Sequence, residues 1–123
     1  MKDIQHIVSE APILRESIEL YKEFYGYLKT FPKKDQYLLG RRCEDYLLDF
    51  LEAIMGAVSA PKEDKLEFLT DANIKFEVLK FLFRVARDLK MIDNKKYLAL
   101  ESRVQEIGKM LGGWIRSLNL KTA

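Results

Sequence analysis

The stretch from Tyr97 to Leu118, YLALESRVQEIGKMLGGWIRSL, decides the fold class of this chain. Its apolar residues recur at intervals of 3, 4, 3, 4, 3 and 4 residues: Tyr97, Leu100, Val104, Ile107, Leu111, Trp114 and Leu118. This spacing places them on one face of an α-helix, and a sustained repeat of about 3.5 residues favours neighbouring helices that cross at about 20°. The stretch therefore predicts a long amphipathic helix in a helical bundle.

Three segments before this helix also repeat with helical spacing. Residues 12–30 form the first, with Pro12 in its first turn and its end set by Pro32, because proline disfavours helical geometry in the residue before it. Residues 39–58 carry two adjoining apolar rows, which predict a helix buried on more than one side. Residues 62–89 form the third; we expect it to continue through residues 70–73, although those polar side chains could instead cap a later start.

The connections between these segments are short. Asp93 is the predicted N-cap of the last helix, and Ile92 is placed to pack on Tyr97. Four long helices with short connections predict an all-α fold, an antiparallel up-down-up-down four-helix bundle. The whole chain, residues 1–123, is predicted to be one domain, in which residues 1–11 either are a flexible N-terminus or extend the first helix.

Composition narrows the class of protein further. The chain has 123 residues, 48% of them hydrophobic and 33% charged, which is enough for one core and too little for two domains. Its one cysteine, Cys43, cannot form an internal disulfide, and its apolar row predicts a buried small hydrophobe. No apolar run approaches the length of about 20 residues that a membrane span requires. We expect a cytoplasmic protein that does not enter a membrane.

Catalytic and cofactor chemistry has little support in the sequence. The one histidine, His6, and the one cysteine, Cys43, are too few for a zinc, haem or Cys–His nucleophilic site within one chain. His6 is best interpreted as a solvated or packed imidazole. The glycine-rich phosphate-binding motifs Gly-x-x-x-x-Gly-Lys and Gly-x-Gly-x-x-Gly are both absent. The sequence therefore predicts a protein that is not an enzyme and holds no metal or cofactor.

The basic charge is concentrated in the second half of the chain. Residues 1–60 contain 8 Lys and Arg against 10 Asp and Glu, whereas residues 72–123 contain 11 against 5. Cations in helical register on the last two predicted helices are candidate nucleic-acid-binding residues: Lys80, Arg84, Arg87, Lys90, Lys109 and Arg116. Lys96 and Arg103 form a second column on the last helix. The competing interpretation is that each stripe is only the solvated face of an amphipathic helix.

Three glycines interrupt the last helix. Each costs roughly 1 kcal/mol relative to alanine in a helix interior. Gly108 and Gly112 lie four residues apart on one face, where they would let another helix approach closely, with Trp114 as an anchor beside the gap. The approaching helix could belong to the same bundle or to a neighbouring subunit. In a third interpretation, Gly112 and Gly113 end the helix.

Two segments resemble a known family. The segment from Phe76 to Leu118, and above all its end IGKMLGGWIRSL, resembles the accessory variability determinant (Avd) proteins of bacterial and phage diversity-generating retroelements. The segment FPKKDQYLLGRRCEDYLLDFLE, from Phe31 to Glu52, is similar to the second helix of that family. Its Phe-Pro and Leu-Gly pairs are shared with a wider group of four-helix proteins encoded in ribosomal RNA intervening sequences. That group is the main alternative, with a role as a structural or oligomeric scaffold.

The resemblance to Avd implies a function and a set of partners. It implies a non-catalytic protein that assembles as a homopentamer, binds the reverse transcriptase of the retroelement, and engages its template RNA during mutagenic cDNA synthesis. Two features of the sequence agree with what the resemblance implies. They are the basic helical surface without catalytic groups and the glycines that permit close packing near the C-terminus.

Overall fold

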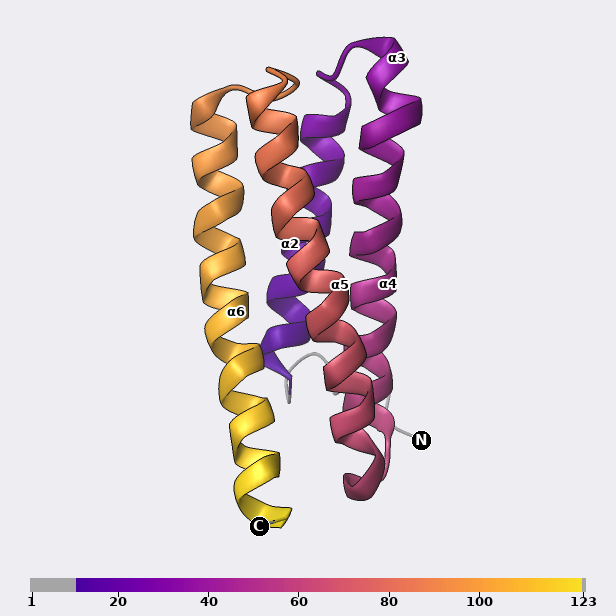
Figure 1. The fold of residues 1–123 in the computed structure, drawn as a ribbon, viewed down its shortest axis with the longest axis vertical. Coiled ribbons are helices and arrows are strands. Elements are labelled where there is room, and N and C mark those ends of the chain that lie inside the picture. The colour runs from indigo at the N-terminus through magenta and orange to yellow at the C-terminus, as the bar shows by residue number, and fades with distance from the viewer. Residues whose placement is uncertain (1–10, 123) are drawn as a thin grey trace.

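The computed structural model describes residues 11–122, and four long helices account for most of them. They are α2 (Pro12–Leu28), α4 (Arg41–Ser59), α5 (Lys62–Asp88) and α6 (Asn94–Thr122) (Figure 1). Residues 11–122 contain no strand. The predicted all-α four-helix fold is confirmed.

The four helices pack in a ring around one core. α2 packs against α4 and α6, and α5 packs against the same two helices. Each connection joins helix ends that lie at the same end of the bundle (Figure 1). Phenylalanines from three helices fill the centre: the ring centroids of Phe24 and Phe83 are 5.3 Å apart, and those of Phe50 and Phe76 are 4.9 Å apart. Burying these rings provides much of the driving force for folding of the bundle.

Most of the predicted helix boundaries agree with the structure. Pro12 is the first residue of α2, where its missing N–H costs nothing. Asp93 caps α6, since its Oδ1 accepts a hydrogen bond of 2.8 Å from the backbone N–H of Lys96, and Ile92 and Tyr97 are both buried. α5 runs unbroken through residues 70–73, where Leu69 and Ala72 are buried in the core and the Thr70 hydroxyl donates to the Leu66 carbonyl of its own helix. The alternative of a later start is wrong.

Helical turns precede the second long helix, so helical backbone begins earlier than residue 39, where the apolar rows start. A short helix, α3 (Lys33–Asp35), and a π-helical turn, η1 (Gln36–Gly40), lead directly into α4. Gly40 is buried, and a Cβ atom there would collide with the Leu28 side chain and lie 3.1 Å from the carbonyl oxygen of Asp35. Glycine at this position therefore lets the end of α2 pack closely against the start of α4.

Candidate nucleic-acid interface

A groove between α5 and α6 brings together four of the residues singled out in the sequence. It has a volume of about 350 Å³, and its lining includes Lys80, Gly108, Lys109 and Gly112. The remaining lining residues are Asn73, Phe76, Glu77, Val104 and Gln105. The groove is the part of the predicted basic surface that the fold assembles from two helices.

The cations of this groove already have carboxylate partners. Lys80 Nζ lies 3.0 Å from Glu77 Oε1, and Lys109 Nζ lies 3.4 Å from Glu106 Oε1. Such exposed pairs contribute little to stability, but each places a negative charge beside the cation and reduces the local attraction for phosphate. The predicted stripe is therefore less positive than the sequence of its cations alone suggests.

The other predicted cations are distributed over the bundle. Arg87 pairs with Asp88 at 3.1 Å. Arg84, Lys90 and Arg116 are exposed, and none of them forms an ion pair with a carboxylate in the described part of the chain. Lys90 follows the end of α5, whereas Arg116 lies in the C-terminal part of α6, toward the opposite end of the bundle (Figure 1). The fold does not gather all six candidates on one surface.

The second predicted column on the last helix faces α2. Arg103 Nε donates to Glu23 Oε1 at 3.0 Å, and its Nη1 lies 3.5 Å from Glu16 Oε2. Lys96 Nζ lies 5.7 Å from the ring centroid of Tyr27, also on α2. Arg103 therefore ties α6 to α2 and is not available as a free cation.

The glycines and Trp114 do not share a site. A Cβ atom at Gly108 would lie 3.6 Å from Phe76 Cε2, so this glycine faces α5 of the same bundle. α6 continues past Gly112 to Thr122, and the alternative in which the glycines end the helix is wrong. The prediction that Trp114 lies beside the Gly108/Gly112 gap is also wrong, because two further residues rotate a side chain by about 200° around the helix.

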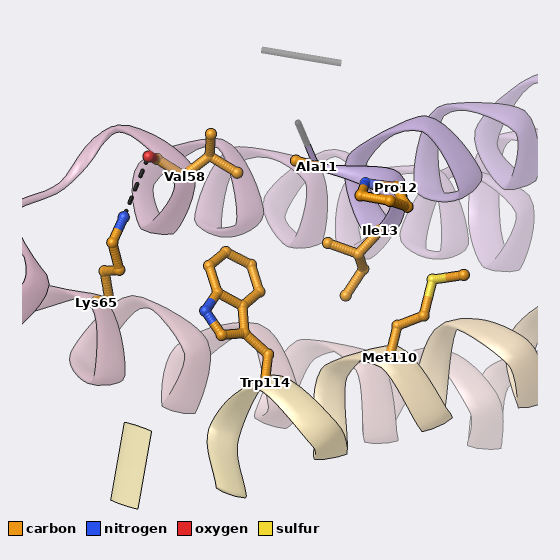
Figure 2. A pocket seen from close by; sticks show the side chains of 7 residues that line it. All are labelled: Ala11, Pro12, Ile13, Val58, Lys65, Met110 and Trp114. Carbon is orange, nitrogen blue, oxygen red and sulfur yellow. Dashed lines mark hydrogen bonds between the residues drawn. The ribbon is translucent and has the colours of Figure 1, made fainter. Parts of the chain in front are cut away.

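Trp114 lines a separate apolar hollow of about 560 Å³, which lies between the start of α2, the end of α4, the start of α5 and the C-terminal half of α6 (Figure 2). Its other lining residues are Ala11, Pro12, Ile13, Val58, Lys65 and Met110. Lys65 Nζ donates to the carbonyl oxygens of Ala57 at 2.7 Å and Val58 at 3.2 Å, in the last turn of α4. The one cation of this hollow thus satisfies helix-terminal carbonyls.

A second group of cations, which the sequence interpretation missed, gathers where the connections before α4 and before α6 lie (Figure 1). We call it the basic end, and it consists of six lysines: Lys29, Lys33, Lys34, Lys90, Lys95 and Lys96. Only Lys90 was among the predicted site residues. The acidic balance of residues 1–60 concealed the contribution of the first three, although the Lys33-Lys34 pair was a visible signal.

Other site chemistry is limited. Cys43 is fully buried, and burial raises the pKa of its thiol to about 12. Residues 11–122 contain no group of three or more His, Cys, Asp or Glu side chains able to hold a metal ion. His6 lies outside the described residues. Within the described residues, no helix combines the length and the apolarity needed to cross a membrane.

Comparison with known proteins identifies the family. A family model described as bAvd-like matches residues 13–118, which include all four long helices except the ends of the first and last. No curated protein matches the chain. The match confirms the resemblance to Avd proteins that was noted in the segments containing Phe31 to Glu52 and Phe76 to Leu118. The chain belongs to the bAvd-like family.

Proposed function

We propose that this protein is a non-catalytic accessory factor of a diversity-generating retroelement, which binds the reverse transcriptase and the template RNA and supports mutagenic cDNA synthesis. The observation that carries the proposal is the bAvd-like match over residues 13–118, which supports an Avd-type accessory role. Its place of action would be the cytoplasm, where the polymerase and its template meet.

Binding of RNA is supported by the unequal distribution of charge. Residues 72–123 contain 11 Lys and Arg against 5 Asp and Glu, and four exposed cations in this part of the chain lack a carboxylate partner among the described residues: Arg84, Lys90, Lys95 and Arg116. Clustered cations bind a phosphate backbone by releasing its counterions, with no requirement for base recognition. We expect backbone-directed binding.

Assembly into a homo-oligomer, a pentamer by the family resemblance, is supported by apolar residues on the outside of the bundle. Ile74 and Phe81 of α5 are 57% and 61% exposed, and Leu48 and Met55 of α4 are 45% and 47% exposed. Each pair is seven residues apart and so lies on one side of its helix. Exposed apolar stripes on two neighbouring helices are typical of a protein–protein interface.

A structural scaffold, as in the wider group of four-helix proteins, is the second candidate function, because the same apolar stripes serve it equally well. The two functions differ in their need for a polymerase. Co-expression of the protein with the reverse transcriptase and template RNA of its retroelement tests this difference. The accessory function predicts that the polymerase co-purifies with the protein and that cDNA synthesis on the template falls at least tenfold without it. A scaffold would leave cDNA synthesis unchanged.

A further inference from the structure

We propose that the basic end binds single-stranded RNA, with its lysines on the phosphates and a base stacked on Tyr37. The inference rests on the proposed function and deepens it, because it names the surface that holds the RNA and the form of RNA held.

The lysines of the basic end have no carboxylate partners in the described part of the chain. Three carboxylates lie near them in sequence: Asp88 pairs with Arg87, Asp93 Oδ1 accepts the N–H of Lys96, and Asp35, which follows Lys34, forms no ion pair with a lysine in the described residues. Five of the six lysines are exposed, and Lys96 is half-buried. The contrast with the α5–α6 groove, where Lys80 and Lys109 are both paired, makes the basic end the stronger site for an anion.

The backbone of α6 adds to this positive potential. Lys95 and Lys96 lie in the first turn of α6, which contains no acidic residue. The helix macrodipole places about half a positive charge at an N-terminus, so cations there are unfavourable for the isolated protein and favourable once an anion binds.

The acidic residues at the start of α5 lie too far away to screen the basic end. α5 begins with acidic side chains at Glu63, Asp64, Glu67 and Asp71, at the opposite end of the bundle (Figure 1). With a rise of about 1.5 Å per residue, Asp71 lies roughly 25 to 30 Å from Lys90 along the helix. The Debye length at physiological salt is about 8 Å, so this separation exceeds it about threefold. An extended polyanion is therefore attracted to one end of the bundle.

The backbone conformation of Lys90 is an independent indication that the charge of this side chain has a function at the basic end. The φ angle of Lys90 is 63°, the left-handed conformation in which glycine is strongly preferred. The N–H of Met91 donates to the carbonyl of Ala86, and the N–H of Lys90 donates to that of Arg87, which is the Schellman arrangement that usually ends with glycine. A lysine here strains the backbone in order to place a cation at the basic end.

An exposed aromatic residue favours single strands over duplex. Tyr37, in η1, is 68% exposed, and its neighbour Leu38 is 57% exposed. Both lie in the connection that also carries Lys33 and Lys34. Surfaces that bind single-stranded nucleic acid combine cations for the backbone with aromatic rings on which unpaired bases stack, whereas the bases of a duplex are already stacked on one another.

The test measures the fluorescence anisotropy of a labelled oligouridine of about 15 nucleotides, titrated with the full chain at several salt concentrations. Lys33→Ala with Lys34→Ala should lower affinity roughly tenfold and flatten the slope of log affinity against log salt by about 1.4, since each single-strand phosphate contact contributes about 0.7. Tyr37→Ala should lower affinity at least about fivefold, and Tyr37→Phe should retain it.

The matched control removes two exposed cations at the other end of the bundle, Arg15→Ala with Lys62→Ala, which lie near the starts of α2 and α5, and changes the net charge equally. It should leave affinity within about twofold. Lys90→Gly separates strain from charge, because it should raise the melting temperature while it lowers RNA affinity. Duplex RNA of the same length should bind more weakly and respond little to Tyr37→Ala.

The proposal is overturned if the basic-end variants bind oligouridine with wild-type affinity and slope, or if the control weakens binding as much as they do. In either case RNA binding by the wild type still stands, and only its location is wrong. If the wild type binds no RNA, the proposed RNA-binding function fails as well. Loss of polymerase co-purification with unchanged RNA affinity would assign the basic end to a protein partner and overturn this inference.

Discussion

The guanidinium carbon of Arg87 lies 4.4 Å from the ring centroid of Tyr97, and so links the last turn of α5 to the first turn of α6. Tyr97 is only 7% exposed, and Arg87 also pairs with Asp88. A cation over an aromatic ring is stabilised by the ring quadrupole, more so when both groups are partly shielded from water. One member of the predicted basic stripe is thus a structural residue.

Arg87→Ala should therefore lower the free energy of unfolding by about 1 kcal/mol, because it removes this contact and exposes Tyr97. Urea denaturation of the two proteins measures the change. Arg84→Ala is the control, since Arg84 is exposed without an ion-pair partner among the described residues, and it should change stability by less than about 0.5 kcal/mol. Equal destabilisation by both substitutions would contradict this assignment.

Cys43 should make stability fall at high pH. Burial raises the pKa of its thiol from 9.0 to about 12, so the unfolded chain releases this proton at a lower pH than the folded chain. The contribution is complete below pH 9 and is lost as pH rises toward 12, at about 1.4 kcal/mol per pH unit. Urea denaturation at about pH 8 and about pH 10 should show a smaller decrease for Cys43→Ala than for the wild type. An identical decrease in both proteins, or rapid labelling of the native thiol, would mean that Cys43 is not buried.

Two glycine substitutions should change stability in opposite directions. Gly40→Ala places a methyl group against Leu28 and the carbonyl of Asp35, and should cost about 1 to 3 kcal/mol. Gly113→Ala meets only the Arg116 guanidinium at 3.9 Å, and should stabilise the protein by up to about 1 kcal/mol through helix propensity. Thermal unfolding of both variants should show a lower melting temperature for Gly40→Ala and a higher one for Gly113→Ala. A stabilising Gly40→Ala would show that α2 and α4 do not approach closely there.

The outer apolar stripe of α5 should hold the oligomer together. Light scattering of the wild type at micromolar concentration should give a mass several times 14.4 kDa. Ile74→Glu with Phe81→Glu should reduce that mass toward the protomer and leave the helical circular dichroism intact, because both side chains are exposed in the bundle. Leu98→Glu, at an equally exposed residue of α6, is the control and should not change the mass. A monomeric wild type would refute the assembly.

Helical periodicity was sufficient to predict the fold because it is a local property. The repeat from Tyr97 to Leu118 and the cap at Asp93 depend only on residues within a few turns, and both agree with the structure. The helical start at Lys33 could not be predicted from apolar rows, because the first turn is polar and the π-helical turn that follows exposes Tyr37 and Leu38. The packing of this turn depends on the contact between Gly40 and Leu28, which only the fold brings together.

The candidate site was harder to predict, because the charge that a surface presents depends on which side chains the fold brings beside each cation. Spacing predicted that Lys80 and Lys109 each lie in a basic stripe of its own helix, and only the fold shows that both line one groove. Spacing could not show that Arg103 turns to Glu16 and Glu23 of α2, since that contact joins segments about 80 residues apart. The basic end was missed for the same reason, because its lysines come from two connections that only the fold brings to one end.

The most direct test of the accessory function is the mass of the complex formed when the purified protein is mixed with the reverse transcriptase and template RNA of its retroelement. Size-exclusion chromatography with light scattering at low salt measures it. We predict one species that contains the protein, the polymerase and the RNA, and that loses the RNA as salt increases. Separate elution of the protein from both partners at low salt would contradict the accessory function.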